Sequence, residues 1–356
     1  MTRLRRSSRR QLMATLAAGA LVVAACSGES DASDGDSASG GGGGGTELTV
    51  MVPFPSGLSF YPLFVADARG YLDGIDIQVE SAEGSAAALQ QVLTGQADIC
   101  MCSPGPLLRS VEQGEEFRST YLLYQSGVFD LVTQAGSEVT DVGGLRDSVI
   151  GIDARQGGTE SWLVPLLEEQ GLVLDEDYRL TAVGSGATPV AAFERGEIDA
   201  YAAAYIDVAI MELRGFETAS IEVPGAEAYF DTSLWMTADF IEENPEIVET
   251  IGRGTAMATV WGMDPDNYEE VLDITGEVYP EEVSDREFAL ELLEDTNELF
   301  VLPESADGQW GFHDPDRVAG LIGGLVGQGY LEEEVDSGVF VNDYLDAYND
   351  FEEDDL

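Results

Sequence analysis

Residues 155–159, Arg-Gln-Gly-Gly-Thr, place an arginine, two glycines and a threonine just ahead of an apolar, helix-like run. Free backbone N–H groups at the start of a helix, together with a hydroxyl group, form a favourable site for an anionic oxygen. Gly157, Gly158 and Thr159 could therefore bind an anion, with Arg155 supplying positive charge. The alternative is an ordinary helix cap beside a surface arginine, and the residues alone favour neither.

Acidic and aromatic residues elsewhere in the chain indicate a different kind of ligand. Carboxylates accept hydrogen bonds and aromatic rings stack on flat rings, so together they suit a ring that carries amino or hydroxyl donors. Tyr61, Tyr205 and Asp207 are the strongest candidates because they follow the ends of expected strands. Core packing is the alternative for most of the aromatic residues. The acids are Asp130, Glu160, Asp207 and Asp231, and the aromatic residues are Phe54, Tyr61, Tyr205, Tyr229 and Trp235.

Groups needed for catalysis are scarce. The chain has no lysine and a single histidine, His313, which excludes chemistry on a lysine-bound pyridoxal phosphate. The sequence contains no nucleophile elbow, zinc-binding set or phosphate loop. Cys100 and Cys102 lie on one face of a strand-like run, and we expect free buried thiols because a disulfide across one intervening residue is strained. The sequence thus predicts a binding protein with no catalytic residue, metal or cofactor.

Two stretches of the chain repeat one pattern and place the candidate residues. Residues 89–99, LQQVLTGQADI, and residues 190–200, VAAFERGEIDA, each indicate a helix end, a glycine and a strand that begins after an aspartate. The order strand, helix, strand precedes each stretch, which predicts a mostly parallel sheet flanked by helices. We therefore expect an α/β protein of two lobes. The first comprises residues 47–127 and 228–356, and the second comprises residues 128–227.

The ends of the expected strands gather the candidate ligand-binding residues. In open α/β sheets ligands collect at the carboxyl ends of the strands, and these ends line one cleft if the two lobes face each other. Two β-rich stretches, residues 120–133 and 228–237, can cross between the lobes and act as a hinge. The predicted ligand-binding residues are Phe54, Ser56, Tyr61, Ser103, Pro104, Gln125, Gly157, Gly158, Thr159, Tyr205, Asp207 and Asp231.

The first 46 residues are set apart from these lobes. Residues 3–10 are rich in arginine and residues 12–25 are apolar or small, a run that is too short to span a membrane but has the form of an export signal. It ends in VAAC, which resembles a bacterial lipobox, so we expect cleavage at residue 25 and a lipid on Cys26. Residues 26–46 have the composition of a flexible acidic tether. We expect the protein at the extracytoplasmic face of the cell membrane, exported by either the twin-arginine or the general route.

The chain is strongly acidic. It carries 68 acidic and 16 basic residues, a net charge of −52, and removal of residues 1–25 with their five arginines makes the charge −57. Such a charge repels nucleic acids and anionic lipid headgroups, which excludes both as partners. Acidic residues spread along a whole chain are typical of proteins that work in high salt, where screening weakens their mutual repulsion. The charge therefore indicates the environment rather than the activity.

Several phrases, in order over residues 47–350, give the sequence a resemblance to a known family. They are PLFVADARGYL followed by IDIQVES, ALQQVLTGQADI, DVGGLRDSVIGID, LVPLLEEQGL, FERGEIDAYAAAYID, ADFIEENPEIV and FVNDYL. The sequence resembles the extracytoplasmic solute-binding proteins of ABC importers, in the branch that serves thiamine pyrimidine precursors, sulfonates, taurine and nitrate. The family usually has a Leu-Lys-Gly-Lys before the strand at residues 148–154 and often small residues near Ser103, and this chain departs from both.

This resemblance implies the type II two-lobe fold of periplasmic binding proteins, and a monomer that delivers a solute to the permease and ATPase subunits of a transporter. It favours a thiamine pyrimidine precursor or a related nitrogen heterocycle, with an acid at Asp207. The alternative solute is a small anion such as a sulfonate, taurine or nitrate. A pyrimidine-synthesising enzyme of this fold needs the lysine that the chain lacks, and a transcription regulator needs a DNA-binding segment where residues 1–46 indicate a signal and a tether.

We expect a Cys26→Ser variant to be released from the membrane, because the thiol that carries the lipid is then absent. Cell fractionation followed by electrophoresis measures this release, since the lipidated form also differs in mobility. A variant that stays membrane-bound with unchanged mobility would contradict the lipid anchor.

Overall fold

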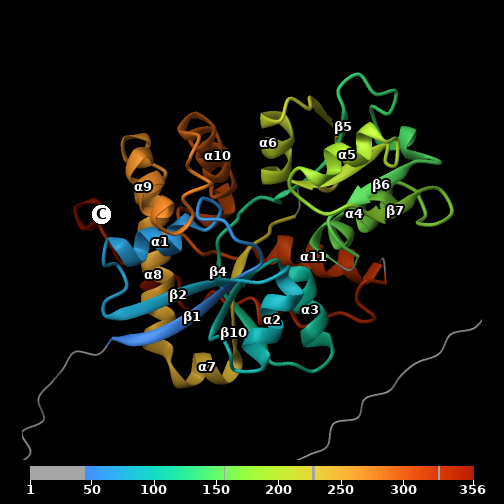
Figure 1. Cartoon of the computed structure of the whole chain (residues 1–356). Helices are drawn as coiled ribbons and strands as arrows, with labels where there is room; N and C mark the ends of the chain where they lie inside the picture. The colour runs from blue at the N-terminus through green and yellow to red at the C-terminus, as the bar shows by residue number, and fades with distance from the viewer. Residues whose placement is uncertain (1–44, 156, 227–228, 328) are drawn as a thin grey trace, which may run out of the picture. The chain divides into compact units, whose positions relative to one another are not determined.

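The computed structural model describes residues 45–155, 157–226, 229–327 and 329–356; Cys26, the expected signal and most of the expected tether lie outside this part of the chain. Two five-stranded sheets are present, and each is flanked by helices (Figure 1). This arrangement confirms the predicted fold class of two α/β lobes.

The first lobe is built around a sheet with the strand order β2–β1–β3–β10–β4. β1 pairs in parallel with β2 and β3, and β10 runs antiparallel between β3 and β4. The strands are β1 (Thr46–Val52), β2 (Ile75–Ser81), β3 (Ile99–Cys102), β4 (Phe117–Leu122) and β10 (Ser233–Thr237). The helices are α1 (Tyr61–Ala68), α2 (Ser85–Leu93), α3 (Pro104–Glu112), α7 (Ala238–Glu243), α8 (Pro245–Gly262), α9 (Tyr268–Val278), α10 (Arg286–Leu299), α11 (Pro315–Gly327) and α12 (Leu345–Tyr348).

The second lobe repeats this topology with the strand order β7–β6–β8–β5–β9. Its antiparallel strand is β5, which lies between β8 and β9. The predicted crossover stretches, residues 120–133 and 228–237, therefore overlap the strands β4, β5 and β10. The connections between the lobes lie at residues 123–128 and 221–232. The strands are β5 (Phe129–Gln134), β6 (Val149–Ile152), β7 (Arg179–Ala182), β8 (Ala200–Ala204) and β9 (Thr218–Ser220), and the helices are α4 (Gly158–Glu169), α5 (Thr188–Glu194) and α6 (Tyr205–Leu213).

The sequence pattern that occurs twice has the same structural role in each lobe. Gly95 and Gly196 end α2 and α5 with φ angles of +68° and +65°, which suit glycine. The carboxylate of Asp98 accepts the backbone N–H of Thr49 in β1 at 2.8 Å, and that of Asp199 accepts the N–H of Val149 in β6, also at 2.8 Å. Each aspartate thus joins the strand after the glycine to the first of the parallel strands in its sheet.

Tyr61, the first residue of α1, lies in the core of the first lobe. Tyr61 is fully buried, and a Cβ atom at Gly262 of α8 would lie only 2.2 Å from its ring. The Tyr61 hydroxyl donates to Asn297 Oδ1 of α10 at 2.9 Å. The close approach of α8 to α1 therefore requires a glycine at position 262, and Tyr61 is a core residue of this lobe.

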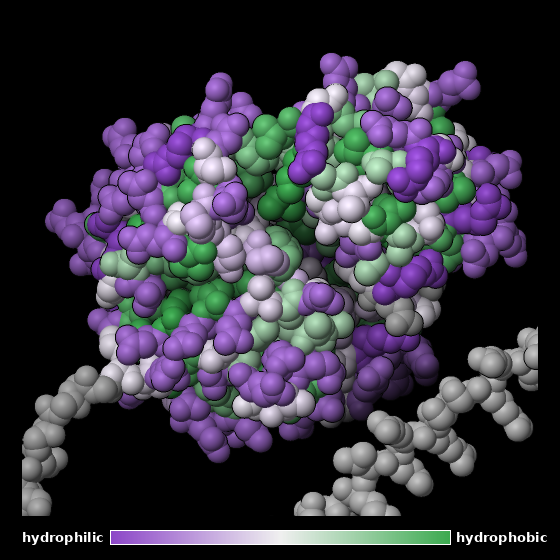
Figure 2. Space-filling model, in the orientation of Figure 1, coloured by the Kyte–Doolittle hydropathy of each residue, from purple (hydrophilic) through white to green (hydrophobic). Residues whose placement is uncertain are grey.

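Hydrophilic side chains cover much of the surface that Figure 2 shows. The ion pairs found in the described part of the chain involve arginine, as in Arg253 with Asp73 at 2.5 Å and Arg286 with both Glu269 and Asp273. The acids far outnumber the arginines, and most acidic side chains in this part of the chain form no ion pair. None of the described helices is long and apolar enough to cross a membrane.

We expect the midpoint of thermal unfolding to rise markedly with salt, because repulsion among the acidic side chains destabilises the folded chain. The screening length falls from about 30 Å at 0.01 M salt to about 3 Å at 1 M. Circular dichroism during heating at these two concentrations measures the shift. A midpoint that does not depend on salt would contradict an adaptation to high salt.

Candidate functional site

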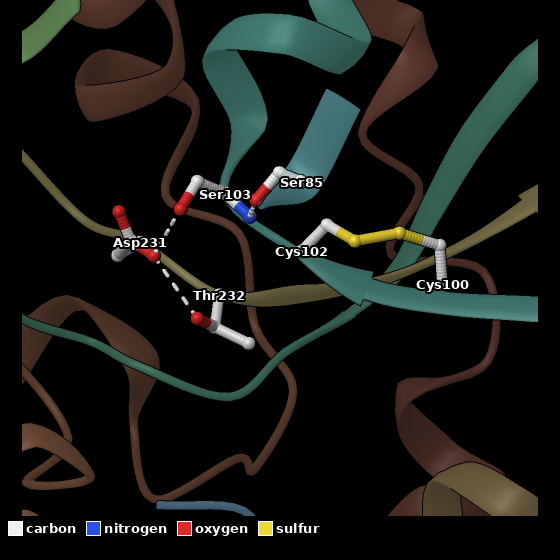
Figure 3. Close-up of a disulfide and its surroundings, with 6 residues drawn as sticks. All are labelled: Ser85, Cys100, Cys102, Ser103, Asp231 and Thr232. Atoms are coloured by element: carbon white, nitrogen blue, oxygen red, sulfur yellow. Dashed lines mark hydrogen bonds between the residues drawn. A yellow bond between two sulfur atoms is a disulfide. The ribbon is translucent and has the colours of Figure 1, made fainter. Parts of the chain in front are cut away.

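Ser103 follows β3 at the carboxyl end of this central strand. It contacts the second of the two connections between the lobes, at residues 221–232. Ser103 is the N-cap of α3, whose first residue is a proline. Its backbone N–H donates to Ser85 Oγ at 3.2 Å, and its hydroxyl donates to Asp231 Oδ1 at 2.8 Å (Figure 3). The end of β3 is thereby held against the connection at residues 221–232.

The expectation of free thiols at Cys100 and Cys102 is wrong, because the structure joins them in a disulfide (Figure 3). Residues two apart in a strand point to the same face, and here their Cα atoms are 5.6 Å apart, within the usual range for a disulfide. Both residues are fully buried. The disulfide immediately precedes Ser103 in the chain, so a covalent link restrains the segment that presents the Ser103 hydroxyl.

Asp231 is a buried carboxylate with only part of its hydrogen-bonding capacity in use. Its side chain is 5% exposed, and its Oδ1 accepts from Ser103 Oγ at 2.8 Å and from Thr232 Oγ1 at 3.0 Å. The other oxygen points away from both hydroxyls in Figure 3. Burial raises the pKa of Asp231 to about 6, and the bonds from Ser103 and Thr232 offset part of that rise. At neutral pH the group is a mainly charged acceptor of hydrogen bonds.

A small cavity surrounds this carboxylate, and residues from both lobes and both connections line it; we call it the hinge cavity. The first lobe contributes Ser103, Pro104 and Gly105, and the second contributes Gly158, Ser161 and Trp162 of α4. Its volume is about 20 Å³. No described residue that lines it is basic. The other lining residues are Gly127, Phe129, Tyr229, Phe230, Asp231, Leu321 and Leu325.

Four of the predicted ligand-binding residues meet in the hinge cavity: Ser103, Pro104, Gly158 and Asp231. Gln125 belongs to the first connection, at residues 123–128, but does not line the hinge cavity. Its side-chain amide donates to the carbonyls of Leu122 and Phe312 at 3.4 Å, and its Oε1 is buried without a partner in the described part of the chain.

The predicted anion site at residues 155–159 is occupied by the chain's own acids. The Thr159 hydroxyl donates to the carboxylate of Asp153, and Arg155 forms an ion pair of 3.0 Å with Glu160. A Cβ atom at Gly157 would lie 3.1 Å from both oxygens of Asp153. Of the two interpretations of this segment, the arrangement favours a helix start that is satisfied from within the lobe.

Two other predicted residues form hydrogen bonds with the chain itself, one within its own lobe and one between the lobes. Asp207 is 4% exposed and accepts from the Gly186 N–H at 2.6 Å and the Tyr201 hydroxyl at 2.8 Å, both in the second lobe. Tyr205, at the start of α6, crosses between the lobes. Its hydroxyl lies 2.9 Å from Ser59 Oγ and 3.0 Å from Thr296 Oγ1 of the first lobe.

Three predicted residues of the first lobe lie outside the hinge cavity. Tyr61 is a core residue, so its assignment to the ligand is corrected: the glycine that makes room for it lies in α8, far away in the sequence. Phe54 packs on Phe60, with ring centroids 5.2 Å apart. Ser56 is buried, and its hydroxyl donates to Glu282.

A second and larger cavity lies between α6 of the second lobe and α10 of the first; we call it the acidic cavity. It has a volume of about 510 Å³, with Tyr205, Val208 and Phe288 among its lining residues. Burial raises the pKa of Asp295, and repulsion from neighbouring acids, among them Glu298 and Glu291 of α10 and Glu212 across the cavity, raises it further. Its acidic lining residues are Asp130, Glu212, Asp285, Glu287, Glu291 and Asp295.

One arginine holds both connections to the first lobe. Arg317 of α11 donates through Nη2 to the carbonyl of Gln125 at 2.7 Å and to that of Tyr229 at 2.8 Å. The sequence does not identify this role, because Arg317 lies in a helical run far from either connection. Trp162 and Phe129, which line the hinge cavity, were likewise not predicted, because both lie in apolar runs that indicate core packing.

A scan against models of protein families matches the family described as NMT1/THI5 like over residues 58–267, more than half of the chain. The chain belongs to the NMT1/THI5-like family. The matched segment includes the ends of β3 and β6 and both connections of this NMT1/THI5-like protein. No curated protein sequence matches the chain.

Solved structures resemble this NMT1/THI5-like protein in fold. The alkanesulfonate-binding protein SsuA from Xanthomonas axonopodis pv. citri, bound to MOPS, is 13% identical with a TM-score of 0.63, covering 83% of this chain and 98% of its own. The periplasmic nitrate-binding protein NrtA from Synechocystis PCC 6803 is 15% identical with a TM-score of 0.59, covering 82% and 84%. The desulfurization enzyme DSZB is 15% identical with a TM-score of 0.50, covering 85% and 98%. The protein has the fold of periplasmic binding proteins.

We expect an Asp231→Asn variant to lose a pH dependence that the wild type has. A carboxyl whose pKa is about 6 in the folded protein, above the usual 3.8, stabilises the fold below pH 4, and this contribution is lost as the pH rises through 6. Relative to the variant, the wild type should lose about 2 kcal/mol of unfolding free energy between pH 4 and pH 7. Urea denaturation of both proteins in constant high salt measures the difference, and parallel pH profiles would contradict it.

Proposed function

We propose that this NMT1/THI5-like protein is the solute-binding component of an ABC import system. It captures one small solute between its lobes and presents it to the permease and ATPase subunits. The hinge cavity carries this proposal, because residues of both lobes and both connections line it around the buried carboxylate of Asp231. The fold shared with the sulfonate-binding and nitrate-binding proteins is consistent with the same role.

The solute is a nitrogen heterocycle with amino or hydroxyl donors, such as a thiamine pyrimidine precursor. Asp231 supplies an acceptor, and the rings of Phe129, Trp162 and Tyr229 supply flat apolar surfaces for stacking. A sulfonate or nitrate ion is the weaker alternative. The hinge cavity has no basic residue among those described, and the donors at Thr159 and Arg155 are bound to the chain's own acids.

Capture requires the lobes to move. A cavity of about 20 Å³ has room for about one water molecule. A heterocycle must therefore enter while the lobes are apart. Once bound, it must hold Trp162 of the second lobe further from Ser103 of the first lobe than they are here. Closure around it is favoured only if the solute binds the closed form more tightly, by a few kcal/mol for a large population shift.

The protein acts as a receptor rather than an enzyme. The fold alone does not decide this, since DSZB is an enzyme with a similar fold. The described lining of the hinge cavity has no lysine, histidine or cysteine, so it lacks the usual nucleophiles and bases apart from Asp231 and two serines. A monomer anchored by a lipid on Cys26 at the extracytoplasmic membrane face fits this role.

We expect a nitrogen heterocycle to raise the thermal unfolding midpoint in high salt and to lower the radius of gyration measured by small-angle scattering. The midpoint rises because the solute binds only the folded form, and the radius falls because the lobes close on it. A panel of aminopyrimidines, nitrate, taurine and alkanesulfonates identifies the class. A response to the anions alone would contradict the heterocycle.

Two variants with the same change of charge locate the solute. Asp231→Asn should weaken its binding by about 10-fold to 100-fold, since it replaces a charged acceptor in the hinge cavity. Asp130→Asn is the control, because that carboxylate lines the acidic cavity and accepts a bond from Ser220. Loss of binding in Asp130→Asn but not in Asp231→Asn would place the solute in the acidic cavity instead.

A further inference from the structure

The loop between β1 and α1, residues 53–60, directs three hydrogen-bond donors at one carboxylate. The backbone N–H groups of Gly57 and Leu58 donate to Glu282 Oε2 at 2.7 and 3.1 Å, and the Ser56 hydroxyl donates to Oε1 at 2.5 Å. Ser56 and Leu58 are fully buried or nearly so, at 1% and 0% exposure. Glu282 comes from the segment between α9 and α10, more than 220 residues away in the chain.

Close packing holds these donors in place without the help of the carboxylate. A Cβ atom at Gly57 would lie 2.9 Å from Cβ of Thr275 in α9, so the loop can approach this helix only with a glycine there. The Ser59 backbone N–H donates to Ser56 Oγ at 3.1 Å, and Ser59 Oγ lies 2.9 Å from Ser56 Oγ as a second acceptor for the Ser56 hydroxyl. The three donors therefore form a preorganised set.

The same loop meets the second lobe. Ser59 Oγ lies 2.9 Å from the hydroxyl of Tyr205, the residue that begins α6. The loop also follows the carboxyl end of β1, and in open α/β sheets this is where ligands collect. Two amides and a hydroxyl at such a position suit the oxygen atoms of an anion.

The chain's own carboxylate takes that place. The first strand–helix loop of the second lobe shows the same feature, since the carboxylate of Asp153 accepts the Thr159 hydroxyl beside Gly157. In both lobes, therefore, an acid of the chain satisfies donors that follow the first parallel strand.

We propose that Glu282 is a specificity-determining residue: its carboxylate fills an anion-accepting loop of the first lobe and thereby bars small oxoanions from it. The inference rests on the proposed role in solute capture and explains how a member of this fold rejects a sulfonate or nitrate. Removal of the side chain leaves the buried N–H groups of Gly57 and Leu58 without an acceptor, and a small anion from solution then takes its place beside the Ser56 hydroxyl.

Glu282→Ala tests this directly. With its donors unsatisfied, the variant should unfold about 5 °C below the wild type in sodium gluconate, whose anion is too bulky to enter the loop. Replacing gluconate by nitrate, formate or methanesulfonate at constant ionic strength should raise its midpoint saturably. Nitrate should also shift the amide resonances of Gly57 and Leu58.

Glu281→Ala is the matched control, because it removes the same charge from the neighbouring, exposed position. It and the wild type should show no saturable response to these anions. An equal response in both variants, or none in Glu282→Ala, overturns the inference. If Glu282→Ala does not fold in gluconate, refolding in nitrate supports the inference and failure to refold in any of the anions overturns it; Glu282→Gln, which keeps an acceptor, should fold in gluconate.

The outcome is separable from that of the proposed function. A wild type that binds nitrate or methanesulfonate overturns the role of Glu282 and leaves a solute receptor of the anion class. A wild type that binds no solute of the panel contradicts the proposed solutes, whereas rescue of Glu282→Ala by anions would still stand.

Discussion

The hydrogen bond between Ser103 and Asp231 is the constraint on which the site depends. It joins the carboxyl end of β3 to the second connection, and so places a carboxylate where both lobes and both connections meet. The cost of burying that carboxylate appears as its raised pKa, and the hydrogen bonds from Ser103 and from the side chain and backbone of Thr232 reduce this cost without removing it. A solute with N–H or O–H groups can supply a further donor to the Asp231 carboxylate.

The acidic composition has consequences inside the protein as well as on its surface. Asp98 and Asp199 join strands, Asp153 and Glu282 satisfy the first strand–helix loops, and Asp231 lines the hinge cavity. Each of these carboxylates accepts hydrogen bonds from backbone or hydroxyl donors, which needs no basic partner. A chain without lysine can therefore organise both lobes with acids alone at these positions, at the price of few donors for an anionic solute.

The sequence is sufficient to predict the fold and to select four residues that line one cavity, for identifiable reasons. Strand and helix periodicity and the repeated glycine and aspartate pattern are local signals, and they predict two lobes and the strand ends that carry Ser103 and Gly158. Tyr61 was misplaced because its surroundings depend on Gly262, which contacts it only in the folded chain. Glu282 and Arg317 were missed for the same reason, since their partners are remote in sequence. The disulfide was missed because the short separation in sequence suggested a strained bridge. In the strand, the Cα atoms of Cys100 and Cys102 lie 5.6 Å apart on one face, which a disulfide can span.

The contacts of Arg317 determine where the chain can bend in the proposed opening of the lobes. One guanidinium nitrogen of Arg317 donates to the carbonyls of Gln125 and Tyr229, so both connections are held to α11 at the same point. Their first-lobe ends must then stay with that lobe, and rotation has to occur beyond them, towards Val128 and the strands of the second lobe. Because both connections are held by Arg317, the rotation axis between the lobes passes close to this residue. Such an axis favours a swing of α4 away from α3 and α11, with little sliding of one lobe over the other.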